Sequence, residues 1–358
     1  MLLAVTTTIL ICVMCSCGVF SISAAATGVL INYIIQLTTS LRMLLLQTTE
    51  LENYMNSTER VNNYATELEQ ESAYDVPDTD PGSNWPNEKP SISFENVSMR
   101  YRKNLPLILK NLTFEIKAGE KIGICGKTGC GKSSTVSTLF RITEIEEGTI
   151  KIGGVDISKL GLYNLRKKIS IIPQESVLFK TDIRKNLDPF GDYSDDQLWE
   201  ALVNSGAIEE SELDEVKKQK FPEEQETAHK FHLDRQVEED GKNFSLGERQ
   251  LLGLSRAVVR NSKVLVLDEA TSSVDYETDA KIQRKIKENF GKNTTILTIA
   301  HRLKTIIDYD RVLVLDAGEI KEFDAPYKLF SNPDSVFRGL CDKAKIKEED
   351  FLVFEKKD

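Results

Sequence analysis

The first 41 residues of the chain carry no charged side chain, and Arg42 is the first to do so. About 20 mostly apolar residues let a helix cross the bilayer core, so this stretch predicts two spans, at about 2–20 and 25–45. A secretory signal peptide is the alternative, because Ser-Ile-Ser-Ala-Ala-Ala resembles a cleavage site. It is disfavoured because the opening lacks the positively charged start of such peptides.

Beyond Arg42, apolar side chains recur near helical spacing at Leu51, Tyr54, Met55, Val61, Tyr64 and Leu68. The membrane helix is therefore expected to continue as an amphipathic cytosolic stalk. Residues 73–91 hold four prolines and several turn formers, which predict a linker. From Ile92, short β-rich runs alternate with helical ones, as in an α/β domain.

These patterns divide the chain into a transmembrane segment, a stalk with its linker, an α/β domain and a charged tail, expected at 1–48, 49–90, 91–345 and 346–358 respectively. Residues 209–241 are charged throughout and have no sustained apolar period, so we expect a solvated insertion there. Its histidines, His229 and His232, are expected to be solvent-exposed rather than metal ligands.

The composition narrows the classes of function. A length of 358 residues allows about two domains, and the net charge of -10 gives no general electrostatic case for a nucleic-acid partner. Three cysteines lie in the apolar opening, where Cys behaves as a small hydrophobe. The others, Cys125, Cys130 and Cys341, are scattered, which indicates no disulfide framework and a reducing cytosol.

The stretch KIGICGKTGCGKSS carries the clearest chemistry. Gly126, Gly131, Lys132 and Ser133 fit G-x-x-x-x-G-K-[ST] between a probable strand and a probable helix. Backbone N–H groups of such a loop and the positive end of the helix face phosphate. Lys132 is expected to reach the β- and γ-phosphates of ATP and Ser133 to ligate Mg²⁺. The neighbouring ATP-binding candidates are Lys127, Thr128, Gly129, Cys130 and Ser134.

The second element is VLVLDEATSSVD. The apolar run 264–267 suits a strand that is buried on both faces. Asp268 at its end is expected to hold the metal, and Glu269 to polarise an attacking water.

The stretch KNFSLGERQLLGLSRAVV, with Ser245, Leu246, Gly247 and Glu248, precedes the acidic strand. It resembles the signature motif of ATP-binding cassette proteins. The resemblance covers nearly all of residues 92–345 and implies a P-loop α/β nucleotide-binding domain with antiparallel β and helical subdomains. It also implies roles for further residues: Tyr101 stacking on adenine, Gln174 as the loop glutamine at the metal, Ser272, Ser273, Val274 and Asp275 as the D-loop, and His301 as the switch histidine.

The sequence around the motifs, including LGLYNLRKKISIIPQ and IRKNLDPF, resembles subfamily C, the multidrug-resistance-associated transporters. Within that subfamily it resembles the fungal oligomycin-resistance-type exporters. This implies an ATPase that drives efflux of organic solutes across the vacuolar or plasma membrane. The resemblance also implies partners, namely a second nucleotide-binding domain and further membrane helices from another chain. The alternative is a membrane-anchored nucleotide-binding fragment without transport. A soluble ATPase of the DNA-repair type is disfavoured by the apolar opening.

One residue departs from the family pattern. The signature position usually held by Gln is Glu248, and Ser245-x-x-Glu248 before an apolar helix predicts a capping box. Such a carboxylate would partly offset the positive helix end that a facing phosphate seeks. We therefore predict a site that binds or hydrolyses ATP less well than one bearing Gln.

Overall fold

The computed structural model describes residues 2–17, 23–76, 81–82, 85–86, 89–219, 228–268, 276–291, 293–300 and 302–355. The chain separates into two units, Met1–Glu71 and Ser72–Asp358. Each unit is described by itself below.

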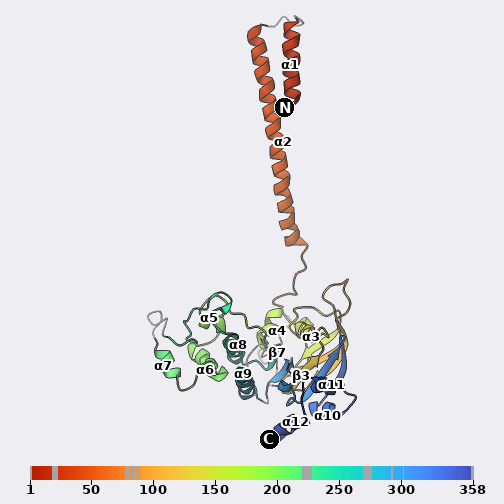
Figure 1. Cartoon of the computed structure of the whole chain (residues 1–358), viewed down its shortest axis with the longest axis vertical. Helices are drawn as coiled ribbons and strands as arrows, with labels where there is room; N and C mark the ends of the chain where they lie inside the picture. The colour runs from red at the N-terminus through yellow and green to blue at the C-terminus, as the bar shows by residue number, and fades with distance from the viewer. Residues whose placement is uncertain are drawn as a thin grey trace. The chain divides into compact units, whose positions relative to one another are not determined.

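The first unit is a helical hairpin in which α1 (Leu2–Ser16) lies beside the start of α2 (Ala24–Thr66) (Figure 1). At 1.5 Å per residue, α2 is about 65 Å long. Hydroxyl groups along it donate back to the helix, as Thr38 does to the Ile34 carbonyl at 2.8 Å. Such bonds satisfy these hydroxyl donors within the helix, which suits an apolar solvent.

Of the described helices, α2 is long and apolar enough to cross a membrane, over a segment within Ala25–Thr66. Its large apolar side chains are exposed, Leu37 by 63% and Leu45 by 69%. The apolar stretch of α1, Val5–Met14, is shorter than the span of about 20 residues predicted for it. One continuous helix covers both the second expected span and the expected stalk.

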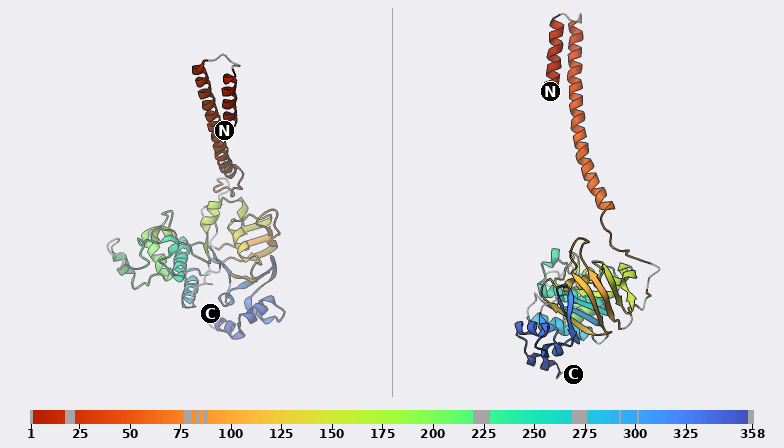
Figure 2. Two further views of the ribbon diagram at one scale, coloured as in Figure 1. Left: turned by 45° about the horizontal axis from the view of Figure 1, so that its top comes forward. Right: turned by 90° about the vertical axis from the view of Figure 1, so that its right-hand side faces the viewer.

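The described residues of the second unit form two β-sheets (Figure 2). Its antiparallel sheet has the strand order β2-β1-β4-β5, with β1 at Ile92–Met99, β2 at Leu109–Ile116, β4 at Glu147–Ile152 and β5 at Val155–Asp156. Its six-stranded sheet has the order β10-β9-β3-β8-β7-β6, formed by Glu319–Asp324, Arg311–Asp316, Lys121–Gly126, Thr295–Ile299, Val264–Asp268 and Ile169–Ile172. Strands β6, β7, β8, β3 and β9 are parallel to one another, and β10 pairs antiparallel with β9.

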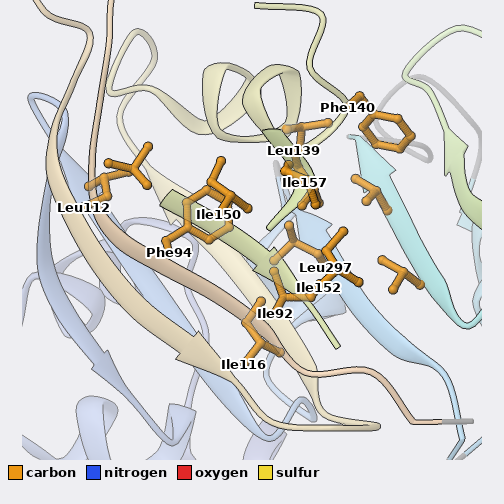
Figure 3. Close-up of a cluster of buried hydrophobic side chains, with 14 of the residues drawn as sticks. Ile92, Phe94, Leu112, Ile116, Leu139, Phe140, Ile150, Ile152, Ile157 and Leu297 are labelled. Carbon is orange, nitrogen blue, oxygen red and sulfur yellow. The ribbon is translucent and has the colours of Figure 1, made fainter. Parts of the chain in front are cut away.

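Apolar side chains fill the space between the two sheets (Figure 3). Phe94 of β1 stacks on Phe114 of β2 with ring centroids 4.5 Å apart. Leu297 of β8 and Leu139, at the end of α3 (Lys132–Leu139), belong to the same buried cluster. The alternation of buried and exposed positions on β2 shows that one face of the small sheet supplies this core.

The helical lobe packs around a separate apolar core. Its helices are α5 (Ile183–Leu187), α6 (Asp195–Ser205), α7 (Leu213–Lys218) and α8 (Leu246–Arg260), and α9 (Tyr276–Asn289) contacts both α6 and α8. Helix α8 begins at the N-cap Ser245 and ends at Asn261, which adopts a left-handed conformation. Figure 1 shows α8 between α6 and the strands.

The interpretation of 209–241 as a solvated insertion is wrong for its last part. Phe231, Leu233 and Val237 lie in the core of the helical lobe. His232, expected to be exposed, is only 4% exposed and meets the Trp199 ring edge-on. These three apolar positions are two and four residues apart, too few and too broken by charged residues to indicate a strand, so their burial depends on contacts with distant residues. Residues 220–227 lie outside the described residues.

The remaining described helices of the unit are short, with at most eight residues each. The short α4 (Leu162–Lys168) follows the 3₁₀ turn Ile157–Lys159, while further 3₁₀ turns cover Glu239–Gly241 and Leu303–Thr305. Helices α10 (Pro326–Ser331), α11 (Val336–Lys343) and α12 (Glu348–Glu355) close the chain. The segment expected as a charged tail is therefore helical over Glu348–Glu355, and its Phe351 packs on Phe330 with ring centroids 4.7 Å apart.

Candidate nucleotide-binding site

The loop between β3 and α3 depends on two glycines. Gly126 has φ of 150°, and a Cβ built there would lie 2.2 Å from the backbone oxygen of Leu315. Gly131 has φ of 105°, and its Cβ would lie 2.8 Å from a Leu109 methyl carbon. Positive φ and close neighbours make both positions costly for any other residue. The two glycines let the loop turn tightly over the end of β3.

The first turn of α3 has no side-chain cap, because its N-cap residue is Gly131. Its leading amide groups are therefore open to an external acceptor. The Lys132 ammonium group lies across the loop and donates to the carbonyls of Gly126 at 3.0 Å and Lys127 at 3.2 Å. Open amides with a cation beside them form an anion-binding site.

A cavity of about 600 Å³ opens over this loop. Its lining contains most of the predicted ATP-binding residues, which are Tyr101, Gly126, Lys127, Thr128, Gly129, Gly131, Lys132, Ser133 and Ser134. The Tyr101 side chain is 51% exposed, and its hydroxyl lies 2.9 Å from the Ser134 hydroxyl. Cys130 belongs to the same loop, but its side chain is buried, with only 3% of the residue exposed. The cavity thus joins an accessible aromatic ring to the phosphate-type loop.

The predicted acidic strand ends at the same edge of the sheet. Asp268 is the last residue of β7 and pairs in register with Ile299 of β8, which in turn pairs with Ile124 of β3. All three strands are parallel, so their carboxyl ends meet at one edge. Glu269, residues 272–275 and His301 follow these strands in sequence and lie outside the described residues.

Gln174 follows β6, and its backbone carbonyl accepts a hydrogen bond from the Gln250 amide of α8 at 2.6 Å. The other end of that amide accepts from the Ser176 hydroxyl at 3.0 Å. Gln250 is 2% exposed, which makes this link between the Gln174 loop and α8 a buried one. Among the described residues, neither Gln174 nor Asp268 lines the cavity.

The signature residues form the capping box that their spacing predicts. The Ser245 hydroxyl accepts from the Glu248 amide at 3.3 Å, and the Glu248 carboxylate accepts from the Ser245 amide at 2.6 Å. Leu246 and Gly247 lie in the first turn of α8 between them, and both are half-buried. In the described part of the chain, none of residues 245–248 lines the cavity beside Lys132.

We compared the chain, with its phosphate-binding type of loop and its separate capped helix, with protein families, curated proteins and solved structures. The ABC transporter family matches residues 109–272. The chain is 56% identical over 353 residues to the oligomycin resistance ATP-dependent permease YOR1 of Saccharomyces cerevisiae. This alignment covers 98% of this chain and 24% of the permease. It is 45% identical over 317 residues to ATP-binding cassette sub-family C member 4 of mouse, covering 88% of this chain and 22% of that protein.

Residues 109–272 form an ABC transporter domain. A solved bacterial Atm1-family ABC exporter with ATP bound matches the fold with a TM-score of 0.68 and 27% identity, covering 97% of this chain and 59% of that one. The predicted family and fold class are thereby confirmed, with the subfamily C proteins among the relatives. The chain spans about a quarter of the length of the permease, at 24%.

Sequence reasoning missed two polar residues of the ABC unit. One is Gln250, described above. The other is Lys230, whose ammonium group lies 2.7 Å from the Glu248 carboxylate. Burial alone would raise the pKa of Glu248, but the hydrogen bonds from Lys230 and from the Ser245 amide hold that pKa below its usual value. The available signal was an isolated Lys in a charged segment, which gives no hint of its partner.

Helix α8 is also fixed by its second turn and beyond. A Cβ at Gly253 would lie 2.3 Å from the Ser176 hydroxyl, so the helix and the Gln174 loop approach closely there. Arg256 donates to the carbonyls of Asn186 at 2.6 Å and Val177 at 2.7 Å, and burial lowers its pKa to about 10. Helix α8 is therefore packed closely against residues 174–186 and hydrogen-bonded to them.

Proposed function

We propose that the chain binds ATP with Mg²⁺ in the cavity above the 126–133 loop and hydrolyses it as the ATPase part of a subfamily C exporter. The observation that carries the proposal is the uncapped first turn of α3 with Lys132 beside it, open to a cavity that Tyr101 borders. A triphosphate would accept from the loop amides and Lys132, while the Tyr101 ring stacks on adenine.

The metal site follows from the chemistry of the donors. Ser133 would supply a hydroxyl oxygen from the first turn of α3, Gln174 an amide oxygen from the loop after β6, and Asp268 a carboxylate from the end of β7. Such hard oxygen ligands suit Mg²⁺, which neutralises phosphate charge when bound. Glu269 is the proposed base for the attacking water, and His301 the proposed switch residue.

The proposal includes a partner. Since the described signature residues contribute nothing to the cavity of their own chain, Ser245, Leu246, Gly247 and Glu248 would complete a site on a second nucleotide-binding domain. The D-loop residues 272–275 would lie at the same contact. Further membrane helices would accompany that partner domain, with α2 in the bilayer and the ATPase unit in the cytosol. Vacuolar and plasma membranes both remain candidates.

Nucleotide binding by the full chain in lipid nanodiscs tests the first step. Lys132→Ala should weaken binding of a fluorescent ATP analogue by about tenfold or more, because a charge-assisted bond to phosphate is lost. Lys159→Ala removes an exposed lysine that does not line the cavity and should leave binding unchanged. Equal affinity of the two variants would refute the site.

ATP hydrolysis tests the second step. The chain should hydrolyse ATP slowly alone and faster when a second nucleotide-binding domain is added. Equal rates in the two conditions would refute the partner requirement and would favour the alternative, a membrane-anchored nucleotide-binding protein without transport.

A further inference from the structure

The signature helix presents an electrostatic conflict. The start of α8 carries the positive end of the helix dipole, yet the Glu248 carboxylate lies within its first turn and bonds to the Ser245 amide at 2.6 Å. A carboxylate stabilises the helix there, but it repels any phosphate that approaches the same end. If this end faces a nucleotide, as the proposed function requires, the charge of Glu248 must be balanced.

Lys230 lies where it can provide that balance. Its ammonium group donates to Glu248 at 2.7 Å, on the same oxygen that accepts from the Ser245 amide. The ammonium also lies 5.4 Å from the centre of the Phe244 ring, immediately before the N-cap. The side chain is 41% exposed, so the positive charge is accessible at the tip of α8.

The backbone around Lys230 is held in place. Its neighbour Phe231 is buried and contacts the Phe244 ring at a centroid distance of 5.8 Å. Arg235 donates to the Ala228 carbonyl at 2.9 Å, which closes the segment into a compact turn. These contacts fix the Lys230 backbone beside the capping box, so the ion pair does not depend on a mobile loop.

We propose that Lys230 is a positioning residue of the signature: it holds and neutralises the Glu248 carboxylate, so that the start of α8 can face the triphosphate bound by a second nucleotide-binding domain. The inference rests on the proposed function. Lys230 acts through Glu248, and removing the carboxylate therefore removes the need for Lys230.

A four-variant cycle on the full chain in detergent tests this dependence. The variants are wild type, Lys230→Gln, Glu248→Gln and the double variant. The readout is the association of two copies of the chain as the concentrations of ATP and Mg²⁺ are raised. Lys230→Gln should require about tenfold more ATP, since it exposes an uncompensated carboxylate. Glu248→Gln and the double variant should match wild type within about threefold.

Lys242→Gln is the matched control, because it removes the same charge from an exposed position three residues before Ser245. It should leave association unchanged. Each variant should also keep wild-type affinity for ATP at its own Lys132 cavity, which excludes misfolding. A double variant as weak as Lys230→Gln would overturn the inference, because Lys230 would then act independently of Glu248.

Absence of ATP-dependent association in wild type would count against the proposed partner site, and the ion pair is then judged directly. In isotope-labelled full chain, the carboxyl resonance of Glu248 should titrate at a higher pH in Lys230→Gln than in wild type. An unchanged titration would overturn the inference.

Discussion

Two helices of the same unit, α3 and α8, differ in how the positive end of the helix dipole is treated: one has no side-chain cap and the other has a full capping box. Helix α3 begins after Gly131 with no side-chain cap, and its Lys132 donates to the loop carbonyls of Gly126 and Lys127. Helix α8 begins at Ser245 with a complete capping box, and Lys230 bonds to the carboxylate of that box. The first helix leaves its leading amides open toward the cavity. The second caps its Glu248 amide with Ser245 and carries a carboxylate at its start, and under the proposal above Lys230 balances that negative charge.

The largest loss of ATP binding and of stability should come from a substitution that distorts the loop before α3. Gly126→Ala places a Cβ 2.2 Å from the Leu315 backbone oxygen at φ of 150°, so the loop must shift. We expect loss of ATP binding and about 2–4 kcal/mol lower unfolding free energy, measured by nucleotide titration and urea unfolding.

The control for this change is Gly129→Ala in the same loop. Gly129 also has a positive φ, of 79°, but nothing lies within 4 Å of its added Cβ. It should cost only about 1 kcal/mol. Equal losses at the two glycines would show that backbone conformation, rather than the contact with Leu315, determines the shape of the loop.

The next effect concerns how the capped helix is anchored. Gln250→Met keeps the side-chain volume but leaves the Gln174 carbonyl and the Ser176 hydroxyl without their buried partner. Unfolding free energy should fall by about 1–3 kcal/mol, and ATP-dependent association should weaken because α8 is no longer tied to the Gln174 loop. Gln283→Met on α9, a half-buried glutamine, should change neither. A stable Gln250→Met protein would show that packing alone holds α8.

Much of the α3 side could be predicted from the sequence, whereas the α8 side could not. The loop motif works through backbone geometry that its own glycines impose, so Gly126, Gly131 and Lys132 were readable in one stretch. The capping box was equally local, because Ser245 and Glu248 are three residues apart. Lys230 and Gln250 act through partners that only the tertiary fold brings near. Phe231, Leu233 and Val237 are only three apolar residues in a highly charged stretch, which hid the burial of the segment that carries Lys230.

A carboxylate on the α3 side permits a smaller test. Glu120 lies just before β3, the strand that leads to the loop, and accepts from the Arg311 guanidinium at 2.6 Å. Burial alone would raise the pKa of Glu120, but hydrogen bonds from Arg311 and the Lys117 amide hold it below the ordinary value of 4.5. Its stabilising contribution is therefore complete above pH 4.5 and is lost as the pH falls through the lowered pKa.

Urea unfolding across this acidic range checks the sign. Glu120→Gln should be less stable than wild type near neutral pH, and its stability should fall less steeply on acidification. Glu115→Gln, at an exposed position on β2, should follow the wild-type curve. Nucleotide affinity near neutral pH should not change in either variant, because Glu120 does not line the cavity. A Glu120→Gln curve parallel to wild type would refute the assignment.

The smallest effect is expected at the residue that departs most from the family pattern. The sequence predicts that Glu248 weakens the site completed by this signature, so Glu248→Gln should raise ATP turnover in the presence of a partner domain. Because Lys230 already lies 2.7 Å from the carboxylate, the gain should be small, about threefold or less. In a Lys230→Gln background the same change should give a larger gain, since the carboxylate is then unbalanced. Equal gains in turnover in the two backgrounds would mean that Lys230 does not offset the charge of Glu248. The starts of α8 and α3 would then differ only in the presence of the capping box.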